Sequence, residues 1–106
     1  MRRIALFNAT ELQAGEIRRV ILNGLPPLAI YNLEGEFKAT DDTCTHGAGS
    51  LAEGMIDGDY VVCPYHGGTF DIRTGGPRGP PCSVPLQTYP LEIHNGVIYL
   101  LAEVES

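Results

Sequence analysis

The sequence is short of basic residues and of long apolar segments. It has seven Lys and Arg against thirteen Asp and Glu, and its formal net charge is −6. Proteins that bind nucleic acid neutralise phosphates with Lys and Arg, so this balance argues against a nucleic-acid partner. No segment approaches the ~20 apolar residues of a membrane helix, and the apolar run after Arg2 and Arg3 is only four residues long. We therefore expect no membrane segment, no signal peptide and a cytoplasmic location.

Cysteine and histidine are also few, with three of each in 106 residues. An odd number of cysteines fits poorly with a secreted disulfide scaffold. Two of the cysteines and two of the histidines nevertheless lie within the 23 residues from Cys44 to His66. Such clustering indicates a metal site rather than unrelated buried cysteines and surface histidines.

Helical periodicity is missing from every window of about ten residues, whereas short alternating segments bounded by Gly, Pro and Asn are frequent. Thirteen Gly and eight Pro predict many turns. We expect hairpin turns at Leu33–Glu36, Asp57–Asp59 and His94–Gly96. The fold class is therefore all-β, with small antiparallel sheets in a sandwich or barrel-like arrangement. The expected strands are Arg3–Asn8, Glu16–Leu22, Leu28–Asn32, Glu36–Thr40, Tyr60–Cys63, Thr69–Ile72, Gln87–Ile93 and Val97–Ala102.

We expect a single domain over residues 1–106, with a loop-rich subdomain at about residues 43–85. This central segment is dense in Gly, Pro, Cys and His. Loops of this composition build little hydrophobic core, so a bound metal would have to hold them.

The candidate ligands form two mixed pairs, Cys44-Thr45-His46 and Cys63-Pro64-Tyr65-His66, with sixteen residues between them. Each spacing is short enough for one loop to direct a thiolate and an imidazole to the same point. The four ligands would suit a single zinc ion, but zinc sites usually pair like ligands within a loop. Mixed pairs favour a two-iron cluster, with both cysteines on one iron and both histidines on the other. Spacing alone leaves both possibilities open.

The segments Cys44–Gly47 and Cys63–Asp71 resemble the two sequence boxes of the Rieske [2Fe–2S] family. The resemblance extends over most of the chain, through Leu51, Gly54 and Thr74-Gly75, and the length is similar to that of the small Rieske ferredoxins of bacterial aromatic-ring dioxygenase systems. It implies one [2Fe–2S] cluster and a fold of three antiparallel sheets with the ligand loops at one tip. The cluster ligands it implies, which are also the metal ligands, are Cys44, His46, Cys63 and His66.

The resemblance also implies partners, namely a flavoprotein (FAD) reductase that takes electrons from NADH, and a terminal oxygenase. Only His94 remains once two histidines bind the cluster, so no 2-His-1-carboxylate iron site can form. We therefore expect a monomeric electron carrier that is not itself an enzyme and has no small-molecule substrate. The alternatives are a Rieske subunit of another redox enzyme, of the nitrite-reductase kind, and a structural zinc module.

High-potential Rieske proteins of respiratory complexes carry a disulfide and two hydroxyl groups near the cluster. At the matching positions this sequence has Gly49 and Tyr65 in place of the cysteines, and Gly68 and Phe70 in place of the serine and tyrosine. Fewer hydrogen bonds to sulfur lower the potential, so the resemblance implies a value of about −150 mV, low in the Rieske range.

Other residues invite a functional interpretation that we weigh against a simpler one. Cys82 could be a ligand, but a small apolar filler is the preferred interpretation. His94 is expected to be a solvated turn residue. The pair Asp41-Asp42 is either a docking charge for a partner or part of a solvated loop. Tyr65 could contact a partner at the tip.

Overall fold

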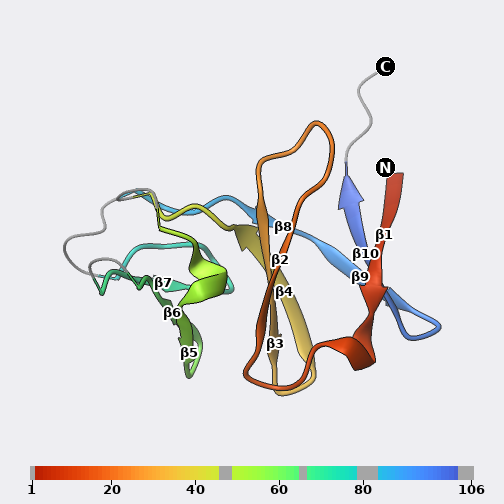
Figure 1. Cartoon of the computed structure of the whole chain (residues 1–106), viewed down its shortest axis with the longest axis horizontal. Helices are drawn as coiled ribbons and strands as arrows, with labels where there is room; N and C mark the ends of the chain where they lie inside the picture. Colours follow the sequence, from red (N-terminus) through yellow and green to blue (C-terminus); the bar gives the residue numbers. More distant parts are fainter. Residues whose placement is uncertain (1, 46–48, 65–66, 79–83, 103–106) are drawn as a thin grey trace.

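The computed structural model describes residues 2–45, 49–64, 67–78 and 84–102 of the chain. These residues form strands and two short 3-10 helices, arranged as three antiparallel sheets (Figure 1). The sheet orders are β1-β10-β9, β2-β3-β4-β8 and β5-β6-β7. The all-β prediction is confirmed, and the strands form three open sheets. The elements are β1 (Arg2–Asn8), η1 (Ala9–Glu11), β2 (Ile17–Val20), β3 (Leu28–Leu33), β4 (Glu36–Asp41), η2 (Leu51–Glu53), β5 (Met55–Asp57), β6 (Tyr60–Val62), β7 (Thr69–Asp71), β8 (Thr88–Tyr89), β9 (Leu91–His94) and β10 (Val97–Ala102).

Strand β3 lies at the centre of the molecule, and all six of its residues are buried. Because side chains alternate along a strand, its two faces contribute to two different cores. Leu28 and Ile30 pack with Phe7, Ile98 and others against the first sheet. The opposite face packs against the third sheet, in a core that comprises Ala29, Tyr31, Leu33, Cys44, Leu51, Val61, Cys63, Phe70, Ile72 and Leu86.

The first and third sheets lie at opposite ends of the molecule, whose longest extent is 38 Å (Figure 1). Strands β1 and β10, the first and last of the described chain, pair with each other, and Arg2 lies opposite Ala102. The third sheet, formed between β4 and β8, is at the other end. No helix in the described part of the chain is long and apolar enough to cross a membrane.

Two hairpin turns follow the predicted geometry. Asn95 and Gly96 both have positive φ, at 50° and 77°, as a type I′ turn requires. Glu34 and Gly35 adopt the same pattern between β3 and β4, and Gly35 N donates a hydrogen bond of 2.7 Å to the Asn32 side chain. These turns set the registers of the β3–β4 and β9–β10 hairpins.

Two strand predictions are corrected by the structure. The segment Gln87–Ile93 is not one strand, because Pro90 separates β8, which pairs with β4, from β9, which pairs with β10. Proline has no N–H for a ladder, so the chain changes sheets there. Strand β5, Met55–Asp57, was not predicted, since three residues give too short an alternation to recognise.

Candidate metal centre

The two expected ligand loops have the same closure. Cys44 N donates to Gly49 O at 2.9 Å, and Cys63 N donates to Gly68 O at 2.7 Å. Outside the first loop, Thr43 forms an antiparallel bridge with Ser50. Val62 pairs with Thr69 in the same way outside the second loop. The two loops therefore have equal length in the sequence and are closed in the same way, next to an antiparallel pair of residues.

The structure brings Cys44 and Cys63 into the same apolar core, and both are buried, with 3% and 2% of their surface exposed. Cysteines on separate loops thus share a water-poor environment, which suits the inner iron of a two-iron cluster. A buried thiolate would be costly alone, so a metal partner is chemically consistent with the site.

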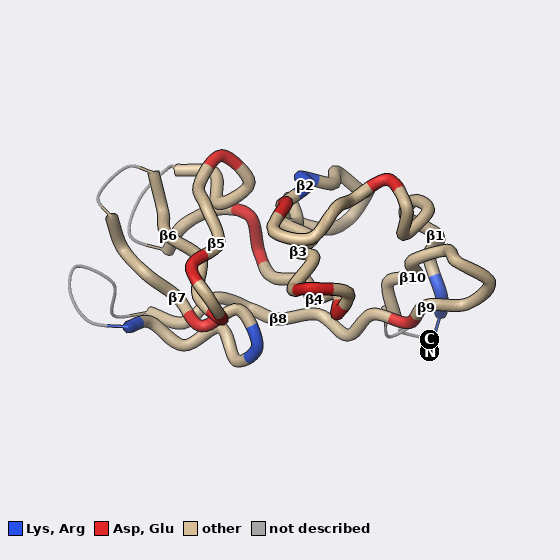
Figure 2. Tube along the Cα trace, turned by 90° about the horizontal axis from the view of Figure 1, so that it is seen from below, with Lys and Arg blue, Asp and Glu red and all other residues tan. Residues whose placement is uncertain are grey.

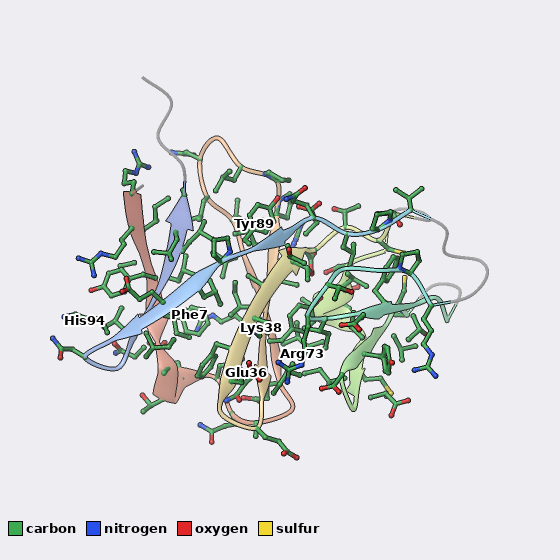
Figure 3. All side chains as sticks on the ribbon, turned by 180° about the vertical axis from the view of Figure 1, so that it is seen from behind. Phe7, Glu36, Lys38, Arg73, Tyr89 and His94 are labelled. Atoms are coloured by element: carbon green, nitrogen blue, oxygen red, sulfur yellow. The ribbon has the colours of Figure 1, made fainter. Side chains whose placement is uncertain are left out.

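Several expected residues lie outside the described residues. They are the two expected histidine ligands, His46 and His66, together with Tyr65 and Cys82. Among the described residues no group of three or more His, Cys, Asp or Glu side chains could hold a metal ion. His94 lies exposed at the end of β9, far from the ligand loops in Figure 3, as expected of a solvated turn residue.

Asp42 anchors the first ligand loop and corrects one prediction from the sequence. Its carboxylate is buried, so it is neither a solvated loop residue nor a surface docking charge. It accepts hydrogen bonds from Ser50 Oγ at 2.6 Å and Ala52 N at 2.9 Å, and it pairs with Arg19 Nε at 3.1 Å. Because it lies two residues before Cys44, this carboxylate joins both ends of the loop to strand β2. No motif in the sequence distinguished Asp42 from Asp41 beside it.

The first loop is also tied to the segment that follows the third sheet. Thr45 Oγ1 donates a hydrogen bond of 2.7 Å to Val84 O. Further along, Leu86 N donates to Gly75 O at 2.7 Å, and Gly75 has a φ of +79°. A Cβ at Gly75 would collide with Leu86 O, so only glycine allows this close approach.

Arg73 connects the third sheet to the second. Its guanidinium contacts Glu36 Oε1 at 2.6 Å and Asp59 Oδ1 at 3.5 Å, and Figure 3 shows Glu36, Lys38 and Arg73 close together. The hydrogen bond between Arg73 and Glu36 raises the pKa of the arginine and lowers the pKa of the carboxyl. Both groups are exposed, so the pair contributes little to stability.

Two tyrosines take part in a chain of hydrogen bonds across strands β3, β4 and β8. Tyr31 OH lies 2.8 Å from Thr40 Oγ1, which itself donates to Asp41 O at 2.8 Å. Tyr89 OH donates to the Asp41 carboxylate at 2.6 Å. Burial raises the pKa of Tyr31, and burial together with the Asp41 carboxylate raises the pKa of Tyr89. Both phenols therefore stay neutral and hydrogen-bonded at physiological pH.

The fold and the cysteine pair define a class of protein. The model of the Rieske [2Fe–2S] domain family matches residues 2–90, and the chain belongs to that family. One [2Fe–2S] cluster is therefore its cofactor, which confirms the cluster expected from the sequence and excludes the zinc interpretation.

Particular relatives narrow the class further. A protein named Ferredoxin CarAc, from Metapseudomonas resinovorans, is 48% identical over 90% of this chain and 89% of its own length. A solved structure described as Sphingomonas yanoikuyae B1 ferredoxin is 38% identical, covers 96% of this chain and all of its own, and has a TM-score of 0.91. Another, 46% identical with a TM-score of 0.88, covers 92% of this chain and all of its own. It is described as a complex of reduced oxygenase and oxidized ferredoxin in carbazole 1,9a-dioxygenase. These names confirm the predicted class, an electron-transfer component rather than a catalytic subunit.

Proposed function

We propose that this chain carries single electrons from an NADH-dependent flavoprotein reductase to the terminal oxygenase of an aromatic-ring dioxygenase system. The observation that carries this proposal is the pair of matched ligand loops with buried cysteines, at the end of the molecule away from β1 and β10. The relatives support it, since the 46% identical ferredoxin was solved in complex with an oxygenase. The proposal includes a cytoplasmic location, where NADH is available, and a monomeric carrier.

Within this proposal Cys44 and Cys63 bind the inner iron, and His46 and His66 bind the outer one. The cluster supplies a reversible one-electron redox centre. The protein buries the two cysteines against Tyr31, Phe70 and their neighbours, which excludes water from the sulfur side. An imidazole side nearer to the surface would give the electron a short path to a partner protein.

The ligand assignment is tested by metal content and by substitution of each cysteine. Anaerobically purified protein should be red-brown and contain about two iron ions and about two acid-labile sulfides per chain. Cys44→Ser and Cys63→Ser should lose the visible absorption, as should His46→Ala and His66→Ala. Cys82→Ser is the matched control and should keep it. A Cys44→Ser variant with normal absorption beside a colourless Cys82→Ser variant would refute the assignment.

The electron-transfer role is tested with the two partner proteins. Stopped-flow spectroscopy should show the cluster bleaching when NADH and a flavoprotein reductase of such a system are added, and recovering colour when the oxidised oxygenase follows. The alternative, a Rieske subunit of a nitrite-reductase-like enzyme, predicts instead a stable complex with a catalytic subunit and no electron transfer to an aromatic-ring oxygenase.

A further inference from the structure

The third sheet has an exposed face next to the second ligand loop. Met55, Val62 and Thr69 lie opposite one another across β5, β6 and β7. Arg78 N donates to Thr69 O at 2.8 Å, so Arg78 extends the same row. Because the residues of a row point to one side of a sheet, these four side chains share a face, which we call the outer face.

Burial shows which way this face points. Val61 and Phe70, the next residues along β6 and β7, are completely buried and face the core. The outer face therefore points to solvent, and Met55 is 65% exposed. Its row also borders the second ligand loop, because Val62 directly precedes the expected ligand Cys63.

Arg78 is a cation held in place without a carboxylate. Its guanidinium carbon lies 4.2 Å from the centroid of the Tyr60 ring, which also belongs to the outer face through its pairing in β6. Among the described residues Arg78 has no ion pair, whereas Arg73 is engaged by Glu36 and Asp59. The row of Tyr60 also holds two carboxylates, Asp57 and Asp71. Asp57 is exposed, and Asp71 accepts hydrogen bonds from the backbone N–H groups of Arg73 and Thr74, at 2.8 and 3.2 Å.

Arg3 and Arg18 also lie over aromatic rings, but Arg3 pairs with Glu92 and Arg18 pairs with Glu11. The net charge is −6, and Figure 2 shows more Asp and Glu than Lys and Arg positions on the part of the chain that contains β5, β6 and β7. A guanidinium stacked on an aromatic ring keeps its N–H edge available, and that edge matches a carboxylate bidentately. Arg, Tyr and Met are also the residues enriched in protein interfaces.

We propose that the outer face is a contact surface for the terminal oxygenase, where Arg78 binds a carboxylate of the partner and Met55 packs against an apolar side chain beside it. This inference rests on the proposed function and names residues for its second step, the transfer to the oxygenase. The outer face lies to one side of the ligand loops. A contact there would therefore fix the orientation in which the oxygenase approaches these loops.

The sign of a charge-reversal effect separates this contact from general attraction. If the acidic carrier were only drawn to a basic partner by its net charge, Arg78→Glu would speed association by adding negative charge. If Arg78 binds a carboxylate, the same substitution slows electron transfer by about tenfold or more and weakens binding similarly. Arg78→Lys, which keeps the charge without the fork, should have a smaller effect.

Arg3→Glu is the matched control for Arg78→Glu. Arg3 also lies over a tyrosine, with 5.6 Å between its guanidinium carbon and the centroid of Tyr99. It differs from Arg78 in pairing with Glu92 at 3.3 Å and in lying on β1, at the far end of the molecule. The Arg3→Glu variant should leave the rate of electron transfer to the oxygenase unchanged or slightly raised. For the apolar part, Met55→Ser should weaken binding several-fold, whereas Ile21→Ser, at an equally exposed position of 63%, should not.

The experiment uses cluster-loaded ferredoxin and its oxygenase, with stopped-flow rates, calorimetric binding constants and the midpoint potential of each variant. Unchanged visible spectra and potentials with slower transfer by Arg78→Glu support the proposal. Three outcomes would overturn the proposed contact while leaving the proposed function intact. They are equal or faster electron transfer by Arg78→Glu, a shift in its midpoint potential that accounts for a slower rate, and a slower reduction by the reductase alone. Failure of the wild-type protein to reduce the oxygenase would overturn both.

Discussion

Replacing Asp42 by alanine tests whether a buried carboxylate holds the first ligand loop. The carboxylate accepts hydrogen bonds from Ser50 Oγ and Ala52 N at 2.6 and 2.9 Å, and hydrogen bonds to a charged group contribute about 1.5–3 kcal/mol each. Loss of both, with two half-buried donors left behind, should lower the free energy of unfolding by about 3–5 kcal/mol. Small proteins lose about 1–3 kcal/mol per molar urea, so the urea midpoint should fall by at least about 1 M.

The partner arginine should matter much less. The side chain of Arg19 is 54% exposed, against 2% for Asp42. Water therefore screens the arginine side of the pair, and Arg19→Gln should cost only about 1 kcal/mol. Asp42→Asn retains one acceptor oxygen and should recover part of the stability. Asp57→Ala, which removes an exposed carboxylate from β5, is the control and should change stability by less than about 0.5 kcal/mol.

Anaerobic urea titrations of the cluster-loaded proteins provide the assay, with far-ultraviolet circular dichroism for the strands and visible circular dichroism for the cluster. The two signals should be lost together in wild type. In Asp42→Ala the visible signal should be lost first, because the loop that carries Cys44 loosens before the sheets unfold. A cost below about 1 kcal/mol for Asp42→Ala, or an equal cost for Arg19→Gln, would refute the anchoring role.

Three further predictions follow from the site and the fold. Because the pKa values of Tyr31 and Tyr89 are raised, an ultraviolet titration should find both phenols protonated at pH ~10.5. The free energy of unfolding should fall as pH rises above about 10, because these tyrosines ionise there only in the unfolded protein. A normal titration of all tyrosines would contradict this. Gly54→Ala should destabilise the protein by about 1–3 kcal/mol, because the added Cβ would overlap Val62 O. An unchanged melting temperature would contradict this prediction. A potentiometric titration should give about −150 mV, and a value above about +100 mV would contradict the low-potential prediction.

The sequence predicted the architecture best where local pattern and tertiary role agree. The Asn95-Gly96 turn and the alternation of β10 have local causes, so their positions followed from the sequence, and β10 has the predicted bounds. Strand β3 is buried on both faces, and its run of apolar residues shows the burial but not which core each face enters. The change of sheet at Pro90 depends on which neighbours are available, and that information is absent from the segment itself.

The candidate site divides in the same way. The spacing of the two cysteines to histidines predicted that both belong to one site, and the structure places them in the same core. Their role as ligands stays a prediction. Asp42 could not, since its partners Ser50, Ala52 and Arg19 come from separate segments that only the folded chain brings together. Arg78 likewise becomes notable only when its position over Tyr60, from a separate strand, is known.

The pairing of β1 with β10 has a practical consequence for attaching this electron carrier to a surface or to another protein. Because Arg2 lies opposite Ala102 at the end of the molecule remote from the third sheet, strands β1 and β10 both offer an attachment site away from the expected ligand loops. Immobilisation on an electrode, or fusion to a catalytic domain through either strand, would leave the ligand loops facing outward. A tether at β10 should therefore preserve the rate of exchange with a diffusing partner, whereas one inserted at the β5–β6 turn should obstruct it.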